Sequence, residues 1–254
     1  MVIQFGHVLQ AFLRPLAFIL LILTALPGSA QVFIEASPVG TTPGGAIVVY
    51  GMNGTNPRIP YEKIKGSPFF NPQWRKASLL EPDGRSLGQH LTRLNLVTHQ
   101  VHFMDKSGVE LAANEGTVAR MISYDTVNGV QRPVVFRNDL EEVNRNYGKS
   151  TRYAQEMNNG KISLLKVCIR SGIQGDSLFG TQKRYYFADR NDYFLRNDKR
   201  IEKLKKLGND EIAALLPSDL REEEWLRQNK LKLNREEDVV RYIDHLNALL
   251  ADKK

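Results

Sequence analysis

Basic and aromatic side chains are interleaved in one segment of this 254-residue chain, which reads KRYYFADRNDYFLRNDKR. Aromatic faces stack on sugar rings or nucleobases, and neighbouring cations attract acidic groups, so this composition is typical of a binding surface. Strands select aromatic residues in any case, so two ordinary strands with aromatic cores and charged outer faces would show the same pattern. The residues that we single out as binding candidates are Lys183, Arg184, Tyr185, Tyr186, Arg190, Tyr193 and Arg196.

Three histidines, His90, His99 and His102, lie before this segment, with carboxylates near them. Zinc sites combine histidine with carboxylates or cysteine. On a strand, His99 and His102 differ by three positions and point to opposite faces, and no ligand spacing here matches a zinc pattern. We therefore expect no metal site, with one of these two imidazoles exposed and one packed beside Phe103.

The sequence contains no cysteine or serine nucleophile motif and no phosphate-binding loop. The single cysteine, Cys168, alternates with apolar residues in LLKVCIR, which favours a buried thiol over a nucleophile. No G-x-S-x-G nucleophile elbow occurs, and the glycine-rich residues 172–180 lack the Lys-Ser/Thr of a phosphate loop. We interpret that glycine-rich stretch as a hairpin loop, and we expect no catalytic residue and no cofactor.

Residues 61–196 have the pattern of an antiparallel β region. Short runs such as WRKASLL and QVHFM are separated by turn residues at intervals of roughly 8–12 positions. Asn128-Gly129 and Asn159-Gly160 are hairpin turns by type, and no strand–helix alternation indicates a parallel nucleotide-binding sheet. We predict an α+β fold, in which an antiparallel β meander, barrel- or sandwich-like, is followed by a C-terminal cluster of short α-helices.

From residue 197 to residue 254 the apolar residues recur at helical spacing. The helices that we predict run from Asp198 to Leu207, from Asn209 to Leu216, from Ser218 or Asp219 through Leu226, and behind an Asn234/Glu237 capping box. Helices this short are marginal in isolation, and each carries an apolar stripe. We expect this tail to dock on the β region through Trp225.

The first thirty residues have the layout of a secretory signal peptide. Arg14 precedes an apolar run from Leu16 to Leu26, and the small residues Gly28 and Ala30 follow it. That run is shorter than the roughly 18–20 apolar residues of a membrane-spanning helix. We expect cleavage between Ala30 and Gln31, which releases a periplasmic or secreted protein, with an uncut anchor as the alternative.

Turn-forming residues and changes in residue pattern divide the chain into four ranges. The ranges that we assign are 1–30 for the signal peptide, 31–60 for a loop-rich segment, 61–196 for the β domain and 197–254 for the helical region. The formal net charge of +7 suits an anionic envelope component or glycan, although such a charge also serves solubility alone. We expect no nucleic-acid partner and no transmembrane segment after cleavage.

Three stretches carry a family resemblance: GSPFFNPQW, LNLVTHQVHF and NKLKLNREEDVVRYIDHLN. Over residues 61–247 the chain resembles exported proteins found widely in Bacteroidota. The resemblance implies a compartment and a source, and it carries over no functional residue. We therefore expect a non-enzymatic binding or accessory protein of the cell envelope. The alternatives are an exported hydrolase with a site assembled from scattered residues, and a structural subunit acting through the helical tail.

Overall fold

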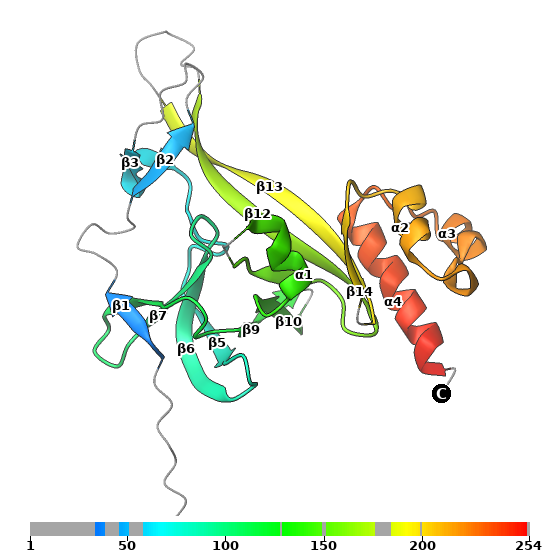
Figure 1. Cartoon of the computed structure of the whole chain (residues 1–254), viewed down its shortest axis with the longest axis horizontal. Coiled ribbons are helices and arrows are strands. Elements are labelled where there is room, and N and C mark those ends of the chain that lie inside the picture. The colour runs from blue at the N-terminus through cyan, green and yellow to red at the C-terminus, as the bar shows by residue number, and fades with distance from the viewer. Residues whose placement is uncertain are drawn as a thin grey trace, which may run out of the picture. The chain divides into compact units, whose positions relative to one another are not determined.

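The protein combines a large β-sheet with a group of short helices at its C-terminal end (Figure 1). The computed structural model describes residues 34–38, 46–50, 58–127, 129–148, 151–175, 184–198 and 200–252. Within these residues fourteen strands form one mixed sheet. The sequence prediction of an α+β fold with a helical tail is confirmed, whereas the leader with its expected cleavage at Ala30 and Gln31 lies outside the described residues.

The strands vary from two to fourteen residues in length. The first eight are β1 (Ala36–Pro38), β2 (Ala46–Tyr50), β3 (Arg58–Pro60), β4 (Ile64–Lys65), β5 (Arg75–Leu80), β6 (Ser86–Asn95), β7 (Gln100–Met104) and β8 (Glu110–Ala113). The others are β9 (Arg120–Val127), β10 (Val130–Arg137), β11 (Ala154–Glu156), β12 (Ile162–Gly175), β13 (Arg184–Asn197) and β14 (Arg200–Leu204).

The main path through the sheet is antiparallel and runs β1-β8-β7-β6-β5-β9-β10-β11-β12-β13-β14. Two meanders, β5 to β8 and β9 to β14, are joined where β5 pairs with β9. Two short strands add parallel pairs: β2 lies beside β12, and β4 lies beside β13. The parallel pairs bring the N-terminal segment onto strands that lie more than a hundred positions later in the chain.

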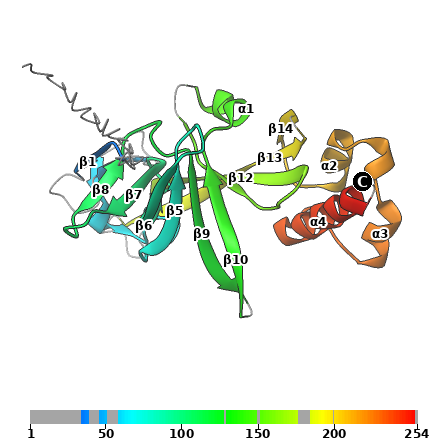
Figure 2. The same cartoon turned by 90° about the horizontal axis from the view of Figure 1, so that it is seen from below.

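Both Asn-Gly dipeptides predict hairpins correctly. β9 and β10 pair around Gly129, which has a φ of 77°, and Figure 2 shows them extending together as a hairpin. β11 and β12 pair around Gly160, whose φ is 150°. A Cβ at Gly160 would overlap the amide of Asn247, so glycine is required there by close approach as well as by backbone conformation.

The long hairpin of β12 and β13 joins the separate parts of the core (Figure 1). Its register is regular, so alternate residues lie on opposite faces. One face places Ile162, Leu164 and Leu195 among the helices. The other places Leu165 and Phe194 against the segment around Val143, which is fully buried. A separate cluster fills the space under β5 to β10.

The helices are short except for the last. They are α1 (Glu141–Asn144), α2 (Asn209–Leu215), α3 (Glu223–Gln228) and α4 (Glu236–Asp252), and the 3-10 turns are Tyr61–Lys63, Arg145–Tyr147 and Ser218–Leu220. No helix in the part of the chain that the structure describes is long and apolar enough to cross a membrane.

The helix predicted from Asp198 to Leu207 is wrong, because this segment forms β14. Asp198 takes a φ of 55° and turns the chain back, so that β14 pairs with the end of β13. Ile201 and Leu204 are three positions apart, a spacing that fits one helix face. On the strand they point to opposite sides and enter two different clusters. Pairing with a long neighbouring strand therefore overrides the local pattern.

The other helix boundaries shift by a few residues. α2 begins at Asn209 as predicted, but Gly208 precedes it as the cap residue. The third predicted helix is divided into the Ser218–Leu220 turn and α3. α4 begins at Glu236. The carbonyl of the preceding residue, Arg235, accepts a hydrogen bond from the Val239 N–H.

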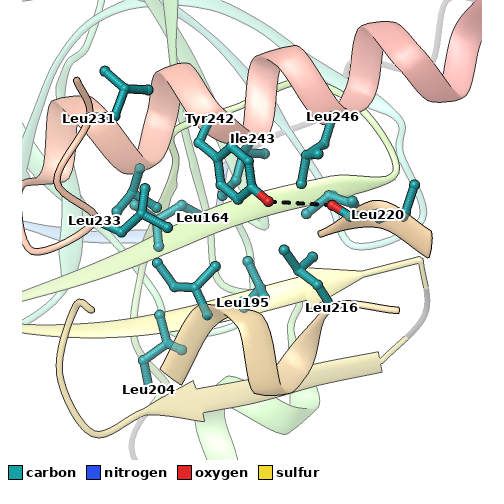
Figure 3. Packing of buried hydrophobic residues seen from close by; sticks show 13 residues of the cluster. Leu164, Leu195, Leu204, Leu216, Leu220, Leu231, Leu233, Tyr242, Ile243 and Leu246 are labelled. Carbon is teal, nitrogen blue, oxygen red and sulfur yellow. Dashed lines mark hydrogen bonds between the residues drawn. The ribbon is translucent and has the colours of Figure 1, made fainter. Parts of the chain in front are cut away.

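The helices pack on the β12–β13 hairpin through an apolar cluster, shown in Figure 3. Ile243 and Leu246 of α4 are fully buried in it. Trp225, the residue that we expected to anchor the contact, is half-buried. Its ring stacks on His245 of α4, with the centroids 4.0 Å apart and the planes 3° from parallel.

Polar contacts fix the position of α4 along the hairpin. Asn247 Oδ1 accepts the Ile162 N–H at 3.0 Å, and Asn247 Nδ2 donates to the Ile162 carbonyl at 2.7 Å. At the other end of the helix, the Glu236 carboxylate accepts from Tyr193 OH and from Lys166 Nζ, both at 2.8 Å. Because hydrogen bonds are directional, these contacts fix the position of α4 along the hairpin, which apolar packing alone does not determine.

Candidate functional site

The alternation of β13 divides the predicted binding residues between two faces. Lys183 lies outside the described residues. Tyr185 and Tyr193 lie on the face that also carries Leu195. Those on the opposite face are Arg184, Tyr186, Arg190 and Arg196. The continuous basic-aromatic tract of the sequence is therefore not one continuous surface.

The two tyrosines on the Leu195 face have structural contacts. Tyr185 packs against a small cluster formed by Tyr61 and Ile64. Tyr193 packs against the helices and donates its hydroxyl hydrogen to Glu236. Burial, together with this carboxylate, raises the pKa of Tyr193 above its usual value. Both rings are half-buried and contribute to packing.

Arg196 belongs to a partly buried ion-pair network at the base of the hairpin. Its Nη1 lies 2.6 Å from Glu156 Oε1, and Arg137 Nη1 lies 3.1 Å from the same oxygen. The Arg196 side chain is only 17% exposed. It also lies ten positions, or roughly 33 Å along an extended strand, from Tyr186. Arg196 therefore stabilises the sheet and is separate from the remaining candidates.

Three candidates remain together near the tip of the hairpin, and the fold adds a fourth residue to them. Arg184 and Tyr186 occupy alternate positions on one face of β13, and Arg190 lies on the same face four positions, or roughly 13 Å, beyond Tyr186. The parallel pairing of β4 places Lys65 directly beside Tyr186, with its side chain on the same face. We call this set, Lys65, Arg184, Tyr186 and Arg190, the Tyr186 face.

The Tyr186 ring is held against the sheet backbone. A Cβ added at Gly175 would lie 2.6 Å from Tyr186 Cε1, so the ring covers a position on β12 where no side chain projects. Even so, Tyr186 keeps 40% of its surface exposed. A ring that is fixed on one side and open to solvent on the other is suited to stacking on a flat ligand.

The Tyr186 face has a positive charge that is poorly neutralised. Arg190 is 70% exposed, and its Nε lies 3.5 Å from Asp192. That carboxylate also accepts from Tyr147 OH at 2.9 Å and from Lys203 Nζ at 3.1 Å. Within the described ranges, neither Lys65 nor Arg184 forms an ion pair, and both are exposed. Two of the three cations on this face, Lys65 and Arg184, therefore have no carboxylate partner among the residues described, and Arg190 shares Asp192 with Lys203.

The other acidic residue nearby points to the opposite side of the sheet. Asp189 accepts from Arg170 through both oxygens, at 2.6 and 2.7 Å. This hydrogen bonding lowers the pKa of the Asp189 carboxyl below its usual value. Arg170 Nη1 also donates to the carbonyls of Ser67 and Phe69, each at 2.7 Å. The Arg170–Asp189 pair links the β12–β13 hairpin to the segment between β4 and β5. It does not change the charge of the Tyr186 face.

Lys65 is the member of this face that the sequence does not reveal. It lies in a two-residue strand, too short to show any alternation. Its neighbour Tyr186 is more than a hundred positions away, and pairing over such distances has no local signature. For Lys65 the sequence shows only a basic residue followed by a glycine, a pattern too general to predict a binding residue.

The expectation that His99 or His102 is exposed is wrong. His99 is 4% and His102 is 5% exposed. His99 lies in the turn after β6 with a φ of 54°, so strand alternation does not apply to it and the turn directs it inward. His102 Nδ1 lies 2.7 Å from Glu110, and the ring beside Phe103 belongs to His90. No group of His, Cys, Asp or Glu among the described residues is arranged to hold a metal ion.

We expect Cys168 to react slowly with a thiol reagent in the folded protein. Its thiol is half-buried beside the cluster under β5 to β10, and burial together with Asp189 raises its pKa to about 11. Since only the thiolate reacts, labelling at about pH 8 should be at least about a hundredfold slower than in denaturant. Timed alkylation followed by mass spectrometry measures this ratio, and equal rates in both states would contradict it.

Comparison of the chain with known proteins gives no match. No protein-family model, no curated protein and no solved structure matches the chain. Its function must therefore be inferred from the surfaces and cavities described above.

Proposed function

We propose that this protein is an exported, non-enzymatic binding protein of the cell envelope that holds an acidic glycan on its Tyr186 face. The observation that carries the proposal is an exposed aromatic ring fixed against the sheet, on a face that carries, within the described residues, three cations and a single carboxylate shared between Arg190 and Lys203. The basic charge of the whole chain supports an anionic partner as well.

Each member of the face has a distinct role in this proposal. The C–H face of a sugar ring packs on the exposed side of Tyr186. Arg184 and Arg190 present planar guanidinium groups, which bind carboxylate or phosphate oxygens in pairs. Lys65 supplies a third, more mobile charge. Because these cations are exposed, binding should weaken as the salt concentration rises.

The Tyr186→Ala variant should bind an acidic polysaccharide about 5- to 150-fold more weakly than the wild type, because stacking on one aromatic ring contributes about 1–3 kcal/mol. Alginate is a suitable probe, with neutral dextran as the uncharged comparison. Replacing Arg184 and Arg190 together by serine should reduce the salt dependence of alginate binding. Biolayer interferometry at several salt concentrations measures both effects.

Two other exposed residues provide matched controls. Tyr124 on β9 is 54% exposed, and the Tyr124→Ala variant should bind alginate as the wild type does. Arg132 on β10 is an exposed arginine, and Arg132→Ser tests the loss of one charge at another place. If Tyr124→Ala abolished binding and Tyr186→Ala did not, the glycan surface would lie around Tyr124 on β9 and the proposal would be wrong.

Export is a separate part of the proposal and has its own test. Because Gly28 and Ala30 follow the apolar run, mass spectrometry of the protein purified from its native cells should find Gln31 as the first residue. The protein should be recovered in the periplasmic or secreted fraction. A chain that still begins at Met1 and stays with the membranes would show an uncut anchor instead.

A further inference from the structure

A small polar cavity of about 160 Å³ lies away from the elements that form the Tyr186 face. It is formed where the turn between β6 and β7 meets the link after β8 and the segment before β11. The polar residues that line it include Thr98, His99, Glu115, Asn138, Thr151 and Arg152. A volume of this size accommodates a few water molecules or one small polar group, since a water molecule in the liquid takes about 30 Å³.

His99 contributes a hydrogen-bond donor to this region. Its Nδ1 lies 3.2 Å from the backbone nitrogen of Tyr153, and because that N–H can only donate, Nδ1 is the acceptor. The neutral ring therefore carries its proton on Nε2. That atom is buried and has no hydrogen-bond partner in the described part of the chain. Burial, reinforced by the charge of Arg152, lowers the pKa of His99 to about 3, so this tautomer persists at neutral pH.

Arg152 contributes a charge without a counter-ion. Its Nε is buried without a hydrogen-bond partner, and among the residues that the structure describes its guanidinium forms no ion pair. The nearby Glu115 carboxylate accepts instead from Thr151, at 2.8 Å from Oγ1 and 3.3 Å from the backbone nitrogen. Burial lowers the pKa of Arg152, and the nearby Glu115 carboxylate offsets this lowering only in part.

We infer that this cavity binds one oxyanionic group, a carboxylate or a phosphate, with the Arg152 guanidinium as its counter-ion and the His99 Nε2–H as a hydrogen-bond donor. Unpartnered buried donors and an unpaired guanidinium are costly in a folded protein unless something occupies them. An oxyanion satisfies both groups at once. The site uses none of the residues of the Tyr186 face, so it is a second binding site that functions independently of the first.

The test uses the full mature chain labelled with 15N at histidine. Sodium phosphate and sodium glucuronate are titrated separately while sodium chloride keeps the ionic strength constant. We expect a saturable shift of the His99 Nε2–H resonance, and the probe that saturates at the lower concentration identifies the phosphate or the carboxylate source. Arg152→Gln should weaken this binding at least about tenfold, because it removes a charge-assisted contact.

Two further variants keep the inference falsifiable. Arg145→Gln removes an exposed arginine from the preceding 3-10 turn and should leave the affinity unchanged. His99→Asn keeps an acceptor for Tyr153 but removes the Nε2–H, and asparagine tolerates the φ of 54°. Its anion binding, followed through the Tyr153 amide in a uniformly 15N-labelled sample, should also weaken. The inference is overturned if neither probe gives a saturable shift, or if Arg152→Gln and His99→Asn bind as the wild type does.

Discussion

The Ile243→Ala variant should lose about 2–5 kcal/mol of unfolding free energy, the usual cost of removing a large aliphatic side chain from a packed core. Ile243 is fully buried between α4 and the β12–β13 hairpin. For a chain of this size the loss corresponds to a fall in melting temperature of about 10 °C. Thermal unfolding followed by circular dichroism measures it. Leu250, half-buried at the end of α4, provides the control, because Leu250→Ala should cost much less.

The same variant tests whether the helices and the sheet share one core. The chain has two tryptophans: Trp74 lies just before β5, and Trp225 lies in α3. Single-tryptophan variants made by phenylalanine replacement therefore report on each part. If Ile243→Ala shifts both fluorescence transitions together, the parts unfold as one unit. If the Trp74 transition stayed at its wild-type temperature, the helices would pack only among themselves.

Stability should also fall as the medium becomes mildly acidic, because of His99. Its folded pKa of about 3 lies below the ordinary value of 6.5, so the unfolded chain binds a proton that the folded chain excludes. The stabilisation is fully present above about pH 6.5 and is lost as the pH falls toward about 3. A single histidine shifted in this way loses about 2 kcal/mol between about pH 7 and about pH 5.

Urea unfolding at several pH values measures this slope. The His99→Asn variant should flatten it, while near pH 7 its stability should stay close to that of the wild type because asparagine accepts the φ of 54°. Part of the slope should remain, since burial also lowers the pKa of His102. The carboxyl groups with lowered pKa, such as Asp189, titrate well below this range and do not contribute to it. An unchanged slope in His99→Asn would show that His99 is not its source.

Local chemistry determined the elements that the sequence identified correctly. The turn at Gly129 and the turn at Gly160 follow from residue types that suit positive φ, so both hairpins were predicted from neighbouring residues alone. α4 was predicted because its apolar residues recur at helical spacing from Val239 to Leu250, a stretch long enough to separate helical from strand spacing. Between Asp198 and Leu207 the segment was too short for that, and pairing with β13 made it a strand.

The sites depended on contacts between distant parts of the chain. The basic and aromatic residues of β13 were visible in the sequence. Which of them share a face with Tyr186 followed from strand alternation once the register was known. The arrival of Lys65 through a parallel pair, and the meeting of His99 with Arg152 across a turn, have no local signature. Turn and helix preferences act over a few residues, whereas the apolar burial that brings distant strands together acts on the whole chain, so only the tertiary structure decided where charge and hydrogen-bond donors collect.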